Sequence, residues 1–274
     1  MGLCVLIGLL EACVTPGRQA APSTPCSPGR SARVSVEHLA EDSAEVTVER
    51  LERECAGGEA ERYASLGMLS MVGRGVPQDE RRAAALFEKA CESGNPQGCS
   101  NLGLLYGEGS GVPRDERRAV ALYEKACELG NAQGCYNLGV LHSKGSGVPR
   151  DEHRASTLFA KACEGGLAAA CVNLGVSYRD GLGVPKDTRR AMAFFERACE
   201  GGMAEVCHHL GVGYSVGDGV PPDERRAAAL FEKGCAGGVA LSCRVLGDFY
   251  ERGLGVPKDE RRAAALKDRA AALP

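Results

Sequence analysis

The sequence predicts an all-α protein, a right-handed α-solenoid of six 36-residue helix-turn-helix repeats stapled by disulfides. Gly-Val-Pro recurs at steps of 36 residues from Gly75 to Gly255, and Leu-Gly recurs in the same register from Leu66 to Leu246. Ten of the 14 cysteines form five pairs whose members lie eight residues apart. A fixed period of this length is typical of stacked repeats that each contribute one helical hairpin. The repeats are predicted at 60–95, 96–131, 132–167, 168–203, 204–239 and 240–274.

The composition supports packed helices and excludes several classes of protein. Of the 274 residues, 44% are hydrophobic and 25% are charged, and the net charge is -3, as in an ordinary soluble folded protein. These values argue against wholesale disorder and against electrostatic capture of nucleic acid. Tryptophan is absent and aromatic residues make up 5% of the chain, so the core must be built from small side chains.

The first helix of each repeat is illustrated by residues 96–131. Cys99, Leu102, Gly103 and Tyr106 fall at i, i+3, i+4 and i+7, which places them on one helical face. Proline is tolerated in a first turn, so this helix is expected to begin near Pro96. The glycine-rich residues 107–111 then break the helical pattern.

The second helix begins at an aspartate that recurs in every repeat. In the same unit Asp115 can supply an N-cap oxygen, and an apolar stripe at helical spacing follows it. Gly130 and Asn131 end the helix with residues suited to a left-handed C-terminal cap. The stripe consists of Ala119, Leu122, Tyr123, Ala126 and Cys127.

Both ends of the array depart from the repeat in the manner of caps. In the last repeat Lys267 replaces the aromatic residue of the second helix, and Ala271 replaces its cysteine. Such changes suit a surface that no further unit covers. Upstream, residues 44–55 keep the register of a second helix in degraded form. We therefore predict an N-terminal cap helix within 33–59.

The five cysteine pairs are predicted to be disulfides between consecutive repeats. The first member of each pair ends a second helix and the other lies one turn into the next first helix, so a short turn brings their Cα atoms within bonding range. Two alternatives remain open: cysteine as a small buried apolar residue, or a metal site, although zinc ligands are usually about two to four residues apart. The pairs are Cys91 with Cys99, Cys127 with Cys135, Cys163 with Cys171, Cys199 with Cys207, and Cys235 with Cys243.

Disulfides on this scale require an oxidising compartment, so an export signal is expected at the N-terminus. Leu3–Leu10 is a short apolar segment, and the Leu10-Glu11-Ala12-Cys13 box that ends it resembles a bacterial lipoprotein signal. We expect 1–12 to be this signal, with Cys13 as the lipid anchor. An ordinary cleaved signal peptide, or an apolar N-terminus of no consequence, is the alternative.

The segment after Cys13 is predicted to be a Pro/Ser/Gly-rich linker over 13–32. Outside the five pairs and the anchor, Cys26 and Cys55 would remain in the mature chain, and they can pair with each other. The expected location is extracytoplasmic, either periplasmic or anchored to the outer membrane as a lipoprotein.

The repeat pattern also resembles a known family. It resembles the Sel1-like repeat, a relative of the tetratricopeptide repeat, and its cysteines at two recurrent positions resemble the helical cysteine-rich proteins. The resemblance implies an exported, disulfide-bridged solenoid; some proteins of that family are described as penicillin-binding with weak β-lactamase activity. The residues that carry it are typified by Ala119-Val120-Ala121-Leu122-Tyr123-Glu124-Lys125-Ala126-Cys127, Gly134-Cys135, Leu138-Gly139 and Gly145-Ser146-Gly147-Val148-Pro149.

Catalytic machinery is not evident in the sequence. A serine β-lactamase needs a nucleophilic serine with a lysine one helical turn later, and no Ser-x-x-Lys occurs. The five histidines show no spacing suited to a zinc site with an open position. We therefore expect no catalytic residues, no cofactor and no metal, although the family resemblance leaves enzymatic activity undecided.

One row of polar residues is the candidate binding site. Asn101, Asn137, Asn173 and His209 each lie two residues after the second cysteine of a pair, off the face that packs on the second helix. Such a row is placed on the concave side of the solenoid, where amides in the tetratricopeptide relatives hold a bound peptide. The alternative is that these residues are solvated or form hydrogen bonds between repeats.

The sequence therefore predicts an extracytoplasmic scaffold that binds a protein or peptide and is anchored to a membrane by lipid, with no nucleic acid as partner. The alternative is a penicillin-binding protein or weak β-lactamase-type hydrolase that acts on β-lactams or cell-wall peptides.

Overall fold

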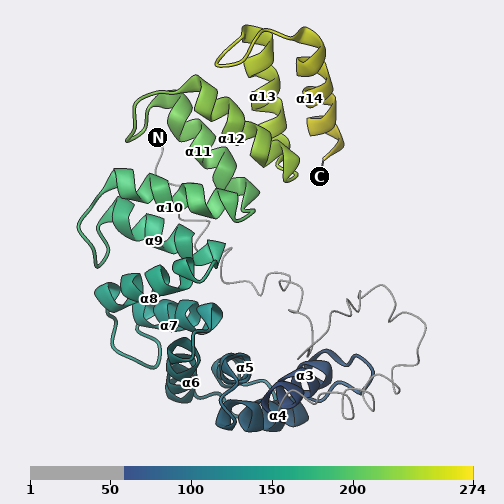
Figure 1. Ribbon diagram of the computed structural model, residues 1–274, viewed down its shortest axis with the longest axis vertical. Helices are drawn as coiled ribbons and strands as arrows, with labels where there is room; N and C mark the ends of the chain where they lie inside the picture. The colour runs from purple at the N-terminus through teal and green to yellow at the C-terminus, as the bar shows by residue number, and fades with distance from the viewer. Residues whose placement is uncertain (1–58, 274) are drawn as a thin grey trace, which may run out of the picture. The chain divides into compact units, whose positions relative to one another are not determined.

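The computed structural model describes residues 59–273, and in this part of the chain all regular structure is α-helical (Figure 1). Each predicted repeat supplies two helices, as the sequence indicated. The helices are α3 Glu59–Val72, α4 Glu80–Glu92, α5 Pro96–Glu108, α6 Glu116–Glu128, α7 Ala132–Lys144, α8 Glu152–Glu164, α9 Ala168–Asp180, α10 Thr188–Glu200, α11 Ala204–Val216, α12 Glu224–Ala236, α13 Ala240–Arg252 and α14 Glu260–Ala272.

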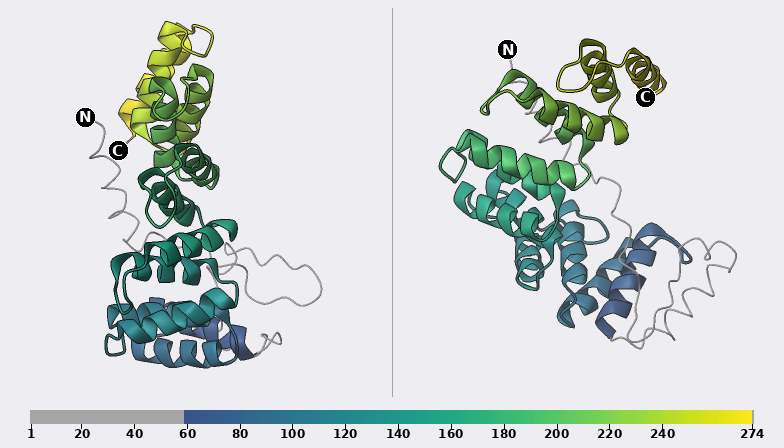
Figure 2. Two further views of the ribbon diagram at one scale, coloured as in Figure 1. Left: turned by 90° about the vertical axis from the view of Figure 1, so that its left-hand side faces the viewer. Right: turned by 45° about the horizontal axis from the view of Figure 1, so that its top comes forward.

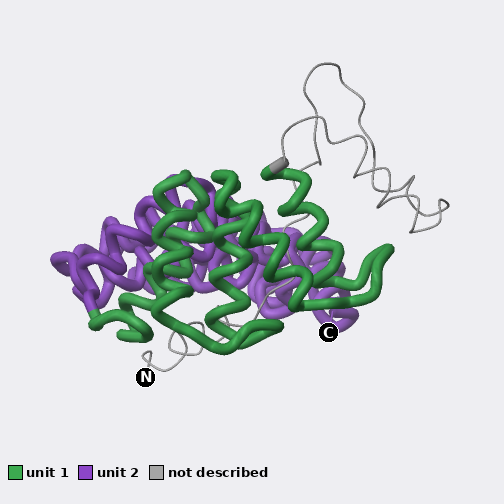
Figure 3. Tube along the Cα trace, turned by 90° about the horizontal axis from the view of Figure 1, so that it is seen from below, with its two compact units in different colours: residues 1–150 green, residues 151–274 purple. Residues whose placement is uncertain are grey.

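The chain divides into two compact units, residues 1–150 and 151–274 (Figure 3). The described part of the first contains α3 to α7, and the second contains α8 to α14. Within each unit every helix packs against the next one along the chain. In the first unit α5 also contacts α3 and α7, so the first helices of successive repeats are neighbours. The hairpins are seen from two further directions in Figure 2. This stacking confirms the predicted α-solenoid.

The predicted helix boundaries follow from capping residues. Asp115 Oδ1 accepts a hydrogen bond from the Arg118 N–H at 3.0 Å, and the equivalent aspartates cap the other second helices in the same way. Pro96 occupies the first turn of α5, which ends at Gly109 in the left-handed conformation with φ 79°.

Two recurrent glycines are required by close packing. At Gly103, the glycine of a Leu-Gly pair, a Cβ atom would lie 2.9 Å from the Tyr123 ring on the second helix of the same repeat. At Gly111 of Gly-Val-Pro, φ is +69° and a Cβ atom would lie 2.4 Å from the backbone carbonyl carbon of Glu80 in the preceding repeat. The first glycine therefore sets packing within a hairpin, and the second sets packing between hairpins.

All five predicted disulfides are present, which decides against buried thiols and against a metal site at these cysteines. Their Cα atoms lie between 4.5 and 4.9 Å apart, and each bridge joins the end of a second helix to the next first helix. A basic side chain reinforces the same junction from the following second helix. Lys125 Nζ donates to the Cys91 carbonyl at 2.9 Å, and Arg197 Nη2 donates to the Cys163 carbonyl at 3.1 Å.

The last hairpin carries charge where the others carry an aromatic ring. Lys267 lies beside Gly247 and forms ion pairs with Asp248 at 2.9 Å and Glu251 at 2.8 Å. The second helices α4, α6, α10 and α12 place the ring of a buried Phe or Tyr against the equivalent glycine, as Phe231 does against Gly211. A lysine with two carboxylate partners suits a face in contact with water.

Several predictions fall on residues outside the described part of the chain. They are the signal at 1–12, the lipid anchor Cys13, the linker at 13–32, the cap helix within 33–59 apart from Glu59, and the pairing of Cys26 with Cys55. Of the helices that are described, none is long and apolar enough to cross a bilayer.

The packing of α11 predicts opposite effects for two glycines in one helix. A Cβ atom at Gly211 would lie 2.8 Å from the Phe231 ring, so Gly211→Ala should destabilise the protein by about 1–3 kcal/mol through overpacking. Gly213 meets only Met192 Cε at 3.4 Å, so Gly213→Ala should be neutral or stabilise by up to about 1 kcal/mol. Guanidinium unfolding of the oxidised protein measures both, and equal effects would contradict the packing described here.

Candidate binding site

The four predicted site residues occupy equivalent places on successive first helices. Asn101 lies on α5 and Asn137 on α7 in the first unit, whereas Asn173 lies on α9 and His209 on α11 in the second. In each case the preceding disulfide fixes the first turn of the helix. The row is thus carried by helices whose N-termini are covalently held. We call these residues the amide face of their unit, formed by Asn101 and Asn137 in the first unit and by Asn173 and His209 in the second.

In the first unit the amide face is part of a hydrogen-bonded ladder. Gln97 Nε2 donates to Asn101 Oδ1 at 3.1 Å, and Gln133 Nε2 donates to Asn137 Oδ1 at 2.9 Å. Asn131 connects the two repeats, since its Nδ2 donates to Gln97 Oε1 at 3.1 Å. Within this ladder the connection between α5 and α7 runs from Asn131 to Gln97.

Asn101 retains an unused donor. Its side chain is buried, and among residues 59–273 its Nδ2 has no hydrogen-bond partner. A buried amide N–H without an acceptor costs about 1–3 kcal/mol, so an acceptor brought to this atom would recover stability. This atom is the clearest sign in the first unit that the row has binding capacity left.

Asn137 is more exposed than Asn101 and also contacts the second helix. Burial raises the pKa of Tyr123 well above its ordinary value, and the charge of Glu108 raises it further. A hydrogen bond from the Asn137 side chain lowers this pKa in part. Because Tyr123 belongs to the preceding repeat, Asn137 itself forms a contact between repeats.

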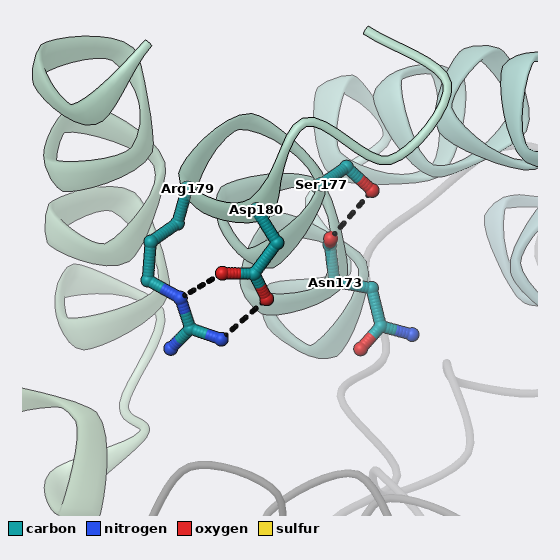
Figure 4. Close-up of polar contacts among 4 residues, drawn as sticks. All are labelled: Asn173, Ser177, Arg179 and Asp180. Carbon is teal, nitrogen blue, oxygen red and sulfur yellow. Dashed lines mark hydrogen bonds and ion pairs between the residues drawn. The ribbon is translucent and has the colours of Figure 1, made fainter. Parts of the chain in front are cut away.

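In the second unit Asn173 is buried, and its surroundings differ (Figure 4). Ser177 Oγ donates to the Asn173 backbone carbonyl at 3.0 Å, a bond that does not involve the side-chain amide. Arg179 and Asp180 form a two-pronged ion pair at 2.8 and 2.7 Å, and the Asn173 amide points away from it. Hydrogen bonds from Arg179 hold the pKa of Asp180 below its ordinary value.

His209 continues the row, and its neighbour His208 belongs to the core. The His208 ring is buried 5.5 Å from the Phe231 ring, and its Nδ1 lies 3.0 Å from Ser242 Oγ. Burial lowers the pKa of His208, and the charge of His209 lowers it further. Burial also lowers the pKa of His209, while Glu205 raises it in part. The uncharged form of both imidazoles is therefore favoured above pH 6.5, and His209 remains partly exposed on the helix face.

The amide face is suited to hydrogen bonding. Amides and a neutral imidazole present both donors and acceptors to a polypeptide backbone. Within 59–273, no three or more His, Cys, Asp or Glu side chains are grouped so that they could hold a metal ion.

A second recurrent group of residues was not predicted from the sequence. An arginine at the start of a second helix covers the tyrosine of its own repeat, with the guanidinium carbon 4.4 to 4.7 Å from the ring centroid. The same arginine forms an ion pair of 2.6 to 3.0 Å with a glutamate of the preceding second helix. We call this group the Tyr–Arg–Glu clamp. It comprises Tyr106, Arg118 and Glu88; Tyr214, Arg226 and Glu196; and Tyr250, Arg262 and Glu232.

A signal for the clamp exists in the sequence. The tyrosine lies 18 residues and the arginine 30 residues after the glutamate, as in Glu196, Tyr214 and Arg226. Residues at these separations come together only when one repeat is stacked on the next, so no local helix pattern reveals them.

The depressed pKa of His208 predicts a loss of stability in acid. Between its folded-state pKa and its ordinary value of 6.5, the unfolded chain binds a proton that the folded protein does not. The stabilisation is therefore complete above pH 6.5 and is lost as the pH falls below that value. Guanidinium midpoints measured from about pH 7.5 to pH 5 should fall, and His208→Asn should flatten this dependence.

Comparison with known proteins is consistent with this architecture. The Sel1 repeat signature matches residues 63–95, 96–131, 132–167, 168–203, 204–239 and 240–274. The comparison with curated proteins gave no match.

Two crystal structures of Sel1 repeat proteins share the fold. One is c5321, a protective antigen present in uropathogenic Escherichia coli strains, with 32% identity and a TM-score of 0.71 over 82% of this chain and 48% of that chain. The other is a Sel1 repeat protein from Oxalobacter formigenes, with 31% identity and a TM-score of 0.68 over 82% of this chain and 65% of that chain. The chain thus spans about half the length of the first protein and just under two thirds of the second.

The Helicobacter pylori cysteine rich protein B is similar over a shorter region, with 30% identity and a TM-score of 0.40 over 47% of this chain and 93% of that chain. That likeness is too low to support an argument about function. Six in-register matches that cover most of the sequence decide the classification, and the chain belongs to the Sel1 repeat family.

Proposed function

We propose that the protein is a binding scaffold that holds a protein or peptide partner along the amide face of a unit. The observation that carries the proposal is the unused donor of Asn101, buried in a row of equivalent polar residues. A backbone carbonyl of a bound chain is the kind of acceptor that such a donor lacks.

The disulfides support the same function by limiting the entropic cost of binding. Each closes a loop of eight residues at the start of a first helix, which is worth about 2–3 kcal/mol in the chain-entropy model. Helices held in this way present their polar residues in a fixed geometry before a partner arrives. The hydrolase alternative has no group of residues in 59–273 that favours it.

The proposed location is extracytoplasmic, with Cys13 as a lipid anchor in the periplasm or at the outer membrane. Five disulfides are typical of proteins that fold in an oxidising compartment. The apolar segment ahead of Cys13 is the second support for export.

Binding along the amide face can be tested with a random-peptide library displayed on phage. Peptides selected on the oxidised protein should lose about tenfold in affinity for each amide removed by Asn137→Ala or Asn173→Ala, because each hydrogen bond is worth about 1 kcal/mol and a stranded partner adds to the loss. Thr157→Ala on the exposed side of α8 is the matched control and should bind normally. Selection of no peptide, or of peptides indifferent to both asparagines, would rule out this binding face.

The compartment can be tested by alkylating the protein at the moment of cell lysis. The ten bridged cysteines should resist alkylation until a reductant is added, after which all ten should react. An intact mass that includes acyl chains on Cys13 would support the anchor. Free thiols in freshly lysed cells would contradict an oxidising location, and a mature chain without acylation would remove the anchor alone.

A further inference from the structure

One Tyr–Arg–Glu clamp in the second unit lacks its glutamate. Ala160 of α8 takes the place that Glu88, Glu196 and Glu232 take in the complete clamps. The tyrosine and the arginine of this clamp, Tyr178 on α9 and Arg190 on α10, are both present. The incomplete clamp therefore has an arginine without the carboxylate that pairs with its equivalents, and a tyrosine without the acceptor that Tyr214 has.

The arginine of the incomplete clamp sits differently from its equivalents. Its guanidinium carbon lies 5.6 Å from the Tyr178 centroid, against 4.4 to 4.7 Å where the glutamate is present. It turns instead to Asp187 of its own helix at 3.4 Å. That carboxylate already caps α10 by accepting the Arg190 N–H at 3.0 Å, so the guanidinium gains only a long second contact.

The tyrosine has also lost an acceptor. In a complete clamp the Tyr214 hydroxyl donates to Glu196 Oε1 at 2.7 Å, whereas the methyl group of Ala160 offers Tyr178 no acceptor at the equivalent place. Tyr178 and Arg190 are both solvent-accessible, and the Arg190 side chain is 65% exposed. Tyr178 and Arg190 therefore lack the carboxylate that Tyr214 and Arg226 share in their clamp.

A second aromatic side chain packs beside the incomplete clamp. Phe194 stacks on Tyr178 with centroids 5.5 Å apart and an interplanar angle of 12°. Every other repeat has leucine at this position of the second helix, as Leu230 illustrates. Aromatic residues and arginine together are enriched at the centres of protein interfaces.

We propose that the incomplete clamp binds an acidic side chain of a partner polypeptide. The partner's Asp or Glu carboxylate takes the place of the missing glutamate and accepts hydrogen bonds from Tyr178 Oη and the Arg190 guanidinium. A side chain is chosen over a terminal carboxylate because the complete clamps hold a glutamate side chain. Tyr178 lies five residues after Asn173, about 140° around α9, so this site faces away from the amide face.

The test uses N-acetylated, C-amidated hexaglutamate and follows the Nε–Hε resonances of the arginines by NMR. The Arg190 resonance should shift in a saturable manner, and Ala160→Glu, which supplies the missing carboxylate, should weaken binding by about tenfold or more. Glu196→Ala converts a complete clamp to the incomplete form, so the Arg226 resonance should then respond as well. Circular dichroism and the count of five disulfides establish that both variants are folded.

Three results would overturn the proposal. They are equal shifts of all exposed arginines, binding that is unaffected by Ala160→Glu, and an equally strong Arg190 response to hexaglutamine with a free C-terminus, which would assign the site to a terminal carboxylate. Asn137→Ala and Asn173→Ala should leave the hexaglutamate response unchanged. Failure of this site is therefore distinguishable from failure of the amide face.

Discussion

The junction between consecutive repeats is the constraint on which the rest of the molecule depends. Within each unit three kinds of contact meet there: a disulfide, a basic side chain on the carbonyl of the first bridged cysteine, and a glycine of Gly-Val-Pro pressed against the preceding second helix. A hairpin of two 13-residue helices cannot bury its apolar faces alone, so this junction turns short amphipathic segments into a stable structure. The same junction fixes the relative positions of the polar residues on consecutive first helices within a unit.

Much of the architecture was accessible from the sequence because its determinants are local. The caps Asp115 and Gly109 act within four residues of the helix ends that they define, and each disulfide joins cysteines eight residues apart across a single turn. The strict 36-residue period then repeats these caps and disulfides along the chain. Because the strict period predicts an aromatic residue at position 267, Lys267 could be recognised from the sequence as a feature of a capping repeat.

The candidate sites were less accessible because they depend on contacts between repeats and on burial. Spacing placed Asn101 and Asn137 on equivalent positions. Only the structure shows that Asn131 bonds to Gln97, that Asn137 forms a hydrogen bond with the preceding repeat, and that Asn101 Nδ2 has no partner among the described residues. The clamp joins residues 18 and 30 positions apart, so Ala160 acquires significance only when α8, α9 and α10 are seen together. Local patterns therefore predicted the scaffold, whereas specific chemistry arose from departures from the pattern.

The contact of Gly111 with the Glu80 backbone also constrains how such a chain can evolve. If a residue were inserted into this loop or removed from it, a residue with a Cβ atom would lie against the preceding second helix in place of the glycine. The next hairpin could then no longer pack closely on that helix. Gene duplication that copies a complete hairpin preserves every such glycine contact. The array is therefore expected to change in length only by whole 36-residue repeats, and its binding surface changes by the same steps.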